Sequence, residues 1–231
     1  MSVCSFYHFL GTFPMKRDPN YNNINNLLAQ IPTRIKSQER IDYKRKKIIK
    51  GALSVFKKKG YHKTTVRDIA KTAKISMGSL YDYISSKEDI LYLFYIEFIS
   101  AYHQEVISIT NNITDPKEKL IMAYRSLLEV GFSLEDEILF GWTEAKNMKK
   151  DHLKEVLKME LGLINYFKDI LEEIKDRFKL EIKDTNIVAN FLVYSAMFGI
   201  LRRWALKLHY SNEQIIDYLL NTQLKDILPQ L

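Results

Sequence analysis

The chain has 231 residues, which is long enough for one large domain or for a small domain beside a larger one. Its 46% content of hydrophobic residues supports a packed core, and its single cysteine, Cys4, excludes an internal disulfide framework and is typical of a reducing compartment. The net charge of +7 is uneven: residues 34–89 hold 16 Lys and Arg against 6 Asp and Glu, whereas residues 91–231 hold 17 against 21. This split indicates a polyanion-binding segment beside a mildly acidic body, with a solvated lysine-rich face as the alternative.

Residues 1–38 show no clear periodicity, and an asparagine-rich run at residues 20–26 favours a mobile N-terminal arm. The first residues are apolar, but Lys16 and Arg17 follow this run, whereas a signal peptide has its basic residues first. The most apolar internal run, residues 187–201, has 15 residues and contains Asn190, so it is short for a membrane span. We therefore expect a cytoplasmic protein without a membrane segment. A DNA contact made by the arm, and Met15 as the true start, are left open.

Residues 38–59 are predicted to form one helix that Gly60 ends as a left-handed cap. Two short helices follow, because the hydroxyls of Thr65 and Ser76 can each accept the free N–H groups of a first helical turn. Small, polar and aromatic residues on the second short helix face outward, which suits the major groove of DNA. The outward residues are Met77, Ser79, Tyr81 and Asp82, and the inward ones are Leu80, Tyr83 and Ile84.

A series of short motifs runs through the same region: Phe56, Gly60-Tyr61, Thr64-Thr65, Arg67, Gly78-Ser79-Leu80-Tyr81, Tyr83 and Ser86-Lys87-Glu88. In this order and spacing, the segment from Tyr43 to Leu91 resembles the DNA-binding domain of the TetR family of transcriptional regulators. The resemblance implies a helix-turn-helix domain over residues 39–86 and a helical domain for effector binding and dimerisation over residues 87–231. Lys74, Met77 and Asp82 depart from the family pattern, so the operator sequence does not follow from the resemblance.

Several residues of this region are candidates for DNA contact. Thr65 can offer a phosphate its hydroxyl and the N–H groups behind it, although it can also serve only as a cap. Arg67 lies one turn further, where it can reach a guanine edge or a phosphate, with a solvated side chain as the alternative. Lys87 resembles the phosphate-clamping lysine of the family. The candidates are Arg45, Lys46, Thr65, Arg67, Met77, Ser79, Tyr81, Asp82 and Lys87.

The remainder of the chain is predicted to be helical throughout. Helical spacing of apolar residues predicts a long helix over residues 87–110. A loop follows, and Pro116 suits the first position of a helix that runs to about Gly131. Further helices are expected over residues 134–147, 150–177, 184–208 and 212–225. With the three helices of the N-terminal domain, this predicts an all-α protein of about nine helices.

The body is rich in aromatic residues, for which ordinary core packing is the default interpretation. The resemblance adds the alternative of a cavity for a small hydrophobic effector such as an acyl-CoA, and its expected walls are Phe98, Tyr102, Tyr124, Phe140 and Trp142. Residues 187–201 are apolar almost all round, so this helix must be buried on more than one side. Paired with the last helix, it is expected to form the interface of a homodimer. The expected interface residues are Phe191, Ser195, Phe198, Ile216 and Leu220.

The expected function is a repressor that binds a palindromic double-stranded operator as a dimer and is released by its effector. A non-switching regulator of the same fold, acting through protein partners, is the alternative. An enzyme is not expected, because the five histidines have no metal-ligand spacing and the chain has no phosphate-binding glycine loop or nucleophile elbow. No metal or cofactor is expected.

Overall fold

The computed structural model describes residues 27–28, 31, 33–225 and 227–228. Within these ranges the secondary structure consists of ten α-helices, one short 3-10 helix and no strand, which confirms the predicted all-α fold. Most of the expected N-terminal arm, with Cys4 and Met15, lies outside the described residues. In the described part of the chain, no helix is long and apolar enough to cross a membrane.

The chain divides into two compact units, the first formed by Met1–Ala101 with Thr143–Leu157 and the second by Tyr102–Trp142 with Lys158–Leu231. One division falls inside the long helix α6 (Lys87–Thr110), so this helix contributes residues to both units. The expected domain boundary after residue 86 stays a prediction. We refer to the two units as the head and the body.

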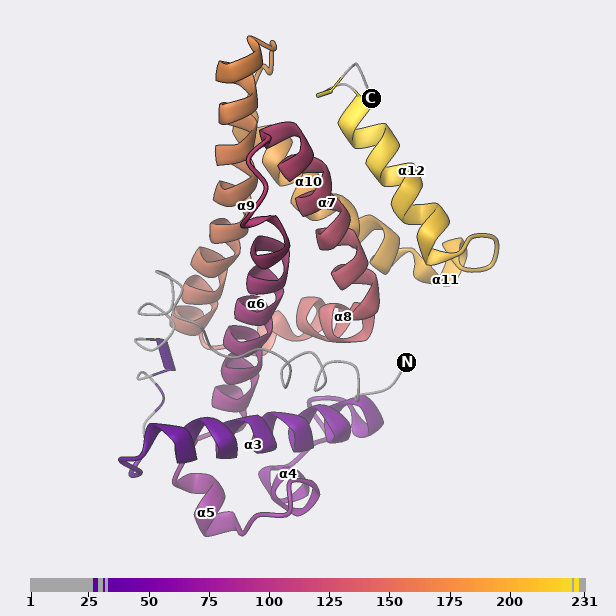
Figure 1. Cartoon of the computed structure of the whole chain (residues 1–231). Helices are drawn as coiled ribbons and strands as arrows, with labels where there is room; N and C mark the ends of the chain where they lie inside the picture. The colour runs from indigo at the N-terminus through magenta and orange to yellow at the C-terminus, as the bar shows by residue number, and fades with distance from the viewer. Residues whose placement is uncertain (1–26, 29–30, 32, 226, 229–231) are drawn as a thin grey trace. The chain divides into compact units, whose positions relative to one another are not determined.

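The head contains the helices α3 (Gln38–Lys59), α4 (Val66–Thr72) and α5 (Met77–Tyr81), and the first part of α6 (Figure 1). It is completed by the end of α8 (Glu135–Glu144), by η1 (Ala145–Asn147) and by the start of α9 (Lys150–Phe178). Helix α3 packs against α4, and α4 packs against α5. The core of the head includes the buried side chains of Ile48, Ile49, Leu53, Ile69, Leu80 and Ile84.

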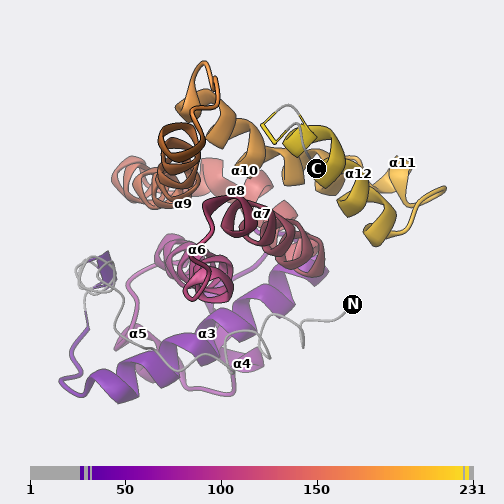
Figure 2. The same cartoon turned by 45° about the horizontal axis from the view of Figure 1, so that its top comes forward.

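The body contains α7 (Pro116–Ser133), most of α8 and α9, α10 (Thr185–Leu201), α11 (Arg203–Leu206) and α12 (Asn212–Lys225) (Figure 2). Helix α7 packs against both α10 and α12. The aliphatic and aromatic side chains between these helices and α9 form one core, which includes Tyr124, Leu127, Phe167, Leu171, Leu192 and Leu219.

The predicted helix ends are confirmed where the stop signal is local. Helices α3 and α6 have the predicted bounds. Pro116 is the first residue of α7, and the side chain of Asp115 caps this helix. The cap at Gly60 differs from the prediction: its φ of 76° is positive, but its ψ of 160° lies outside the left-handed helical region. Gly60 still donates its N–H to the carbonyl of Phe56 at 2.8 Å and so closes the last turn.

The predicted helix over residues 184–208 is wrong after residue 201, because α10 ends at Leu201 and the short α11 follows. After this break, Arg203 contacts Asp136 at 2.7 Å and Lys207 contacts Glu135 at 2.6 Å. These ion pairs join α11 and the turn after it to the first turn of α8. The turn therefore depends on partners that are distant in the sequence.

The turn between α4 and α5 contains Lys74 in the left-handed region, with a φ of 54°. A side chain with a Cβ is strained there, so Lys74→Gly is expected to stabilise the protein by about 1 kcal/mol. Lys71→Gly is the matched control: Lys71 is helical and exposed, and glycine there should cost about 1 kcal/mol. Thermal unfolding of the two variants measures both changes, and a lower melting temperature for Lys74→Gly would contradict the strain.

Candidate nucleic-acid interface

Helix α4 begins with a reciprocal capping box between Thr65 and Asp68. The Thr65 Oγ1 accepts the Asp68 N–H at 3.2 Å, while the Thr65 N–H donates to the Asp68 carboxylate at 3.0 Å. Lys59, from the end of α3, contacts the same carboxylate at 2.7 Å. Hydrogen bonds from Lys59 and from Thr65 hold the pKa of Asp68 well below its usual range. The predicted cap at Thr65 is confirmed. The Thr65 hydroxyl also donates to the Asp68 carboxylate, so a phosphate would compete with Asp68 for this donor.

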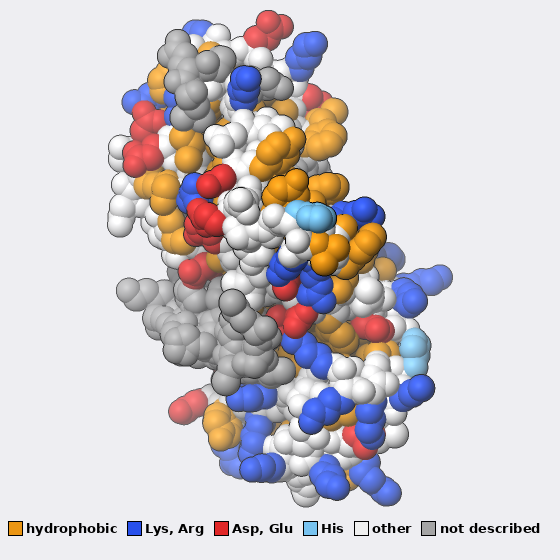
Figure 3. Space-filling view, turned by 90° about the vertical axis from the view of Figure 1, so that its right-hand side faces the viewer, with side chains coloured by type: hydrophobic (Ala, Val, Ile, Leu, Met, Phe, Trp, Pro, Cys, Tyr) orange, Lys and Arg blue, Asp and Glu red, His pale blue; other side chains and the backbone are white. Residues whose placement is uncertain are grey.

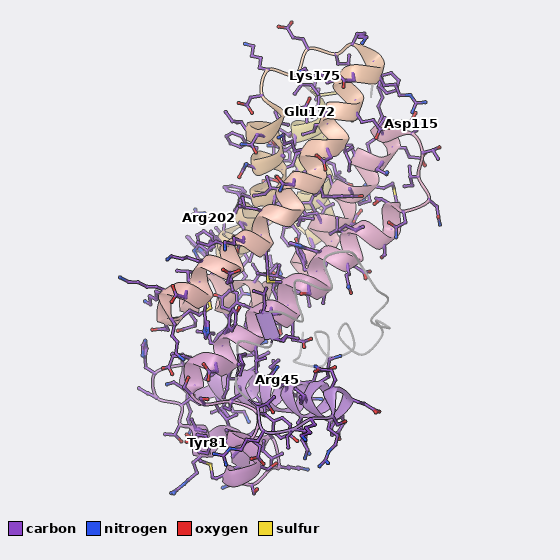
Figure 4. The ribbon with its side chains drawn as sticks, turned by 90° about the vertical axis from the view of Figure 1, so that its left-hand side faces the viewer. Arg45, Tyr81, Asp115, Glu172, Lys175 and Arg202 are labelled. Carbon is purple, nitrogen blue, oxygen red and sulfur yellow. The ribbon has the colours of Figure 1, made fainter. Side chains whose placement is uncertain are left out.

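Helix α5 has only five residues and is capped by Ser76, whose Oγ accepts the Ser79 N–H at 3.1 Å. Leu80 is fully buried, whereas Tyr81 is 50% exposed and lies on the outer side of α5 (Figure 4). Met77, Ser79 and Asp82 are half-buried. The structure therefore places one rigid phenol and smaller side chains on an accessible helix, as the sequence predicted.

The basic candidates of α3 and α4 differ in accessibility. Arg67 is exposed on α4, and Lys46 is half-buried on α3. The expectation that Arg45 contacts the DNA backbone is wrong: its side chain is only 3% exposed. Its guanidinium donates to the carbonyl of Leu28 at 3.0 Å and to that of Ile31 at 2.8 Å.

Lys87, the expected phosphate clamp, has two partners inside the head. Its Nζ donates to the carbonyl of Tyr61 at 2.8 Å and to that of Thr64 at 3.1 Å, and it lies 4.2 Å from the centre of the Tyr61 ring. The lysine therefore ties the first turn of α6 to the turn before α4. This positioning role was not predicted, and a phosphate contact at Lys87 stays a prediction.

The sequence interpretation missed Asp89, a buried carboxylate at the start of α6. Asp89 accepts the N–H groups of Ser85 at 2.9 Å and Ser86 at 3.0 Å, and the Ser86 Oγ accepts the Asp89 N–H in return. The pattern Ser86-x-x-Asp89 is a capping box that the sequence could have revealed. Its other partner could not be foreseen: Lys149 contacts Asp89 at 3.0 Å from the later segment of the head.

The expected effector walls are distributed over both units. In the body, the Tyr102 hydroxyl donates to the carbonyl of Leu127 at 2.9 Å, and the hydroxyl of the buried Tyr124 lies 2.7 Å from the Ser195 Oγ. Phe98 is buried in the head and Phe140 is half-buried in the body. Trp142 is 56% exposed, so its expected place in the wall of an enclosed cavity is wrong.

The expected dimer residues fall into two groups. Phe191 and Phe198 on α10 are 66% and 58% exposed, and Ser195 between them is half-buried. Ile216 and Leu220 on α12 belong to the core of the body, so their expected place in an interface is wrong. The amphipathic α12 turns these two residues toward α7 and α10.

Residues 48–92 match the family model described as "Bacterial regulatory proteins, tetR family". This segment is therefore a DNA-binding domain of the TetR family. The matched residues include the two short helices α4 and α5, so the expected helix-turn-helix lies within this match. Among the described residues, no group of three His, Cys, Asp or Glu side chains could hold a metal ion.

The chain is similar in sequence to proteins that are named as transcriptional regulators. The chain is 31% identical over 111 residues to the HTH-type transcriptional regulator HbdR of Aromatoleum sp. (strain CIB), a match that covers 48% of each protein. It is 31% identical over 121 residues to IcaR of Staphylococcus epidermidis, named as a negative regulator of the biofilm operon icaADBC, which covers 46% of this chain and 65% of that protein. The chain thus spans about half the length of HbdR and about two thirds of that of IcaR.

The likeness to solved TetR-family structures covers more of the chain. The transcriptional regulator FadR of Bacillus subtilis, solved in complex with stearoyl-CoA, has a TM-score of 0.65 and covers 78% of this chain and 97% of that one. At a sequence identity of 20%, this likeness shows a shared fold alone.

Proposed function

We propose that this protein is a ligand-responsive transcriptional repressor that binds a palindromic operator as a homodimer and is released by a small hydrophobic effector. The observation that carries the proposal is the accessible recognition helix α5, capped by Ser76 and built into a segment that has 16 basic and 6 acidic residues. Its excess positive charge favours the phosphate backbone, and Arg67, Ser79 and Tyr81 supply donors for phosphates and base edges.

Dimerisation is supported by an apolar stripe along α10. Five large apolar side chains are exposed on this helix at spacings of four, three, four and three residues: Ile187, Phe191, Tyr194, Phe198 and Leu201. This is the spacing of a helix–helix seam, and an exposed apolar stripe of this length marks a surface for association. A two-fold dimer presents two recognition helices to DNA, which accounts for the proposed palindrome.

The body provides the support for a hydrophobic effector. The Tyr102 and Tyr124 hydroxyls are already paired with protein atoms, as described above, so they leave mainly apolar surface inside the body. Burial lowers the pKa of His103 to about 4, which makes this imidazole neutral at pH 7. A neutral, largely apolar interior favours an acyl chain, and the FadR relative carries stearoyl-CoA.

Helix α6 offers a route by which the effector would change DNA binding. Residues Lys87–Ala101 belong to the head, and Tyr102–Thr110 belong to the body. An effector that binds one position of α6 more tightly than another shifts the population of the dimer between DNA-competent and released forms. The coupling is reciprocal, so operator DNA should weaken effector binding by the same factor.

A second apolar surface favours the alternative of a non-switching regulator that acts through protein partners. Trp204, Leu208 and Tyr210 are exposed on α11 and the turn after it, and Arg202 lies 4.9 Å from the Trp204 ring. In Figure 3 hydrophobic side chains gather around this turn. Such a patch suits a protein partner, and this alternative predicts no response to acyl-CoA.

The test uses the full chain and a pool of random DNA duplexes. We expect selection to enrich a palindrome, and we expect an acyl-CoA to release that duplex. At about 100 times its dissociation constant the effector should add about 2.7 kcal/mol of stability and raise the melting temperature by several degrees. Coenzyme A without an acyl chain is the control. An enriched duplex with no response to acyl-CoAs of any chain length would support the non-switching alternative, and no enrichment would overturn both.

A further inference from the structure

The residues just before α3 are packed into the head. Leu27, Leu28 and Ile31 are buried, and the carbonyls of Leu28 and Ile31 accept the two hydrogen bonds of the Arg45 guanidinium. We call Leu27, Leu28, Ile31 and residues 33–36 the brace. The expectation of a mobile arm up to residue 38 is therefore wrong for the brace.

The Arg45 guanidinium is what fixes the brace to α3. Burial lowers the pKa of Arg45, but a guanidinium remains protonated in proteins, so the charge must be satisfied where it lies. A buried charge without hydrogen-bond partners is costly, and the two brace carbonyls supply partners. The position of the brace is thus specified by the chemistry of one α3 side chain (Figure 4).

The brace also contacts the end of the recognition helix. Asp82 is the C-cap of α5, and its backbone carbonyl accepts the Thr33 Oγ1 at 2.8 Å and the Arg34 N–H at 3.3 Å. The Thr33 Oγ1 in turn accepts the Ile35 N–H at 3.2 Å, which holds the local turn. The last carbonyls of a helix have no partner within it, so these donors complete the C-terminal end of α5.

The brace carries two cationic side chains, Arg34 and Lys36. The Arg34 N–H donates to the Asp82 carbonyl, so the Arg34 backbone is fixed beside α5. The side chains of Arg34 and Lys36 are both exposed. Neither side chain forms an ion pair with another described residue. Asp82 also carries a half-buried carboxylate, and one carboxylate does not neutralise two cations.

We propose that Arg34 is a further DNA-phosphate contact of this protein, placed at the C-terminal end of the recognition helix by the brace. This inference rests on the proposed DNA-binding function. An arginine whose backbone is already fixed gives up less backbone freedom on binding than one on a free tail, and its planar guanidinium matches a phosphate. The brace thereby widens the footprint beyond α4 and α5 and connects it to the residues before the helix-turn-helix.

The experiment measures operator affinity against salt concentration, using a duplex of about 30 base pairs enriched by the full chain. Arg34→Gln should weaken binding about tenfold and reduce the magnitude of the log–log salt slope by about 0.9 for each DNA-bound subunit, because one phosphate contact is lost. Arg34→Lys keeps the charge and should keep the slope. Arg177→Gln, an exposed arginine of α9 in the body, is the control and should leave affinity and slope unchanged.

Thr33→Val tests the brace without changing any charge. It removes the hydrogen bond to the Asp82 carbonyl and the one that the Thr33 Oγ1 accepts from the Ile35 N–H, and it should weaken binding about threefold with an unchanged salt slope. Thermal unfolding verifies that each variant is folded. An unchanged slope in Arg34→Gln beside a wild type that binds DNA would overturn the Arg34 contact alone, whereas a wild type that enriches no duplex would overturn the proposed function with it.

Discussion

Replacing Phe191 and Phe198 together by aspartate is expected to convert the proposed dimer to monomers and to weaken operator binding about a hundredfold or more. The two side chains are more than half exposed within one chain, and they lie on the apolar stripe of α10. In a two-fold interface each aspartate would face apolar side chains and another carboxylate, and both effects oppose association. Sedimentation velocity measures the oligomeric state, and a duplex-binding assay measures the affinity.

The control introduces the same residue, aspartate, at exposed apolar positions elsewhere in the chain. Ile109→Asp and Met122→Asp change exposed apolar positions on α6 and α7, outside the stripe. These variants should remain dimeric and bind the duplex as the wild type does. A dimer that survives the double aspartate substitution on α10 would show that another surface, such as the patch at Trp204, makes the interface.

Gly51→Ala is expected to destabilise the head by about 3 kcal/mol and to lower the melting temperature by roughly 5–10 °C. A Cβ at Gly51 of α3 would lie 2.8 Å from the Ala73 Cβ and 2.9 Å from the Ala73 backbone nitrogen. Backbone atoms at the end of α4 cannot move aside as a flexible side chain can. The helices would therefore have to separate, which loosens the platform that carries α5.

Gly78→Ala is the matched control, because a Cβ there meets no atom within 4 Å. Gly78 lies inside α5, where alanine has the higher helix propensity, so this variant should gain up to about 1 kcal/mol. The same substitution thus has opposite signs at two glycines of the head. Urea unfolding of the three proteins measures the difference, and equal stabilities of Gly51→Ala and the wild type would contradict the close approach of α3 and α4.

Features set by local chemistry could be predicted from the sequence. The caps at Thr65 and Ser76 and the start of α7 at Pro116 each depend on a few neighbouring residues. The family motif is also a local pattern, and the family match over residues 48–92 confirms the resemblance, whereas the role of α5 as recognition helix stays a prediction. The caps at Thr65 and Ser76 and the start of α7 were confirmed, whereas the left-handed cap expected at Gly60 was not.

Features set by distant partners could not be predicted. Arg45 lies in a run of basic residues that is typical of a solvated helix face. Only the folded brace supplies the two carbonyls that accept hydrogen bonds from the buried Arg45 guanidinium. Helix α10 is apolar on nearly all sides, so the pattern did not separate its core side from its exposed stripe. The misplacement of Ile216 and Leu220 has the same origin, because their burial depends on where α7 and α10 pack.

The composition of the head has a consequence for the order of events during synthesis. Asp89 at the start of α6 is paired with Lys149, and Tyr92 stacks on His152 with 3.9 Å between ring centres. Because the head takes its last segment from Thr143–Leu157, it cannot complete its packing on the ribosome until residue 157 has emerged. The start of α6 therefore lacks these partners while residues 102–142 are made, and a graft limited to residues 39–86 would lack both α6 and the segment 143–157 of the head.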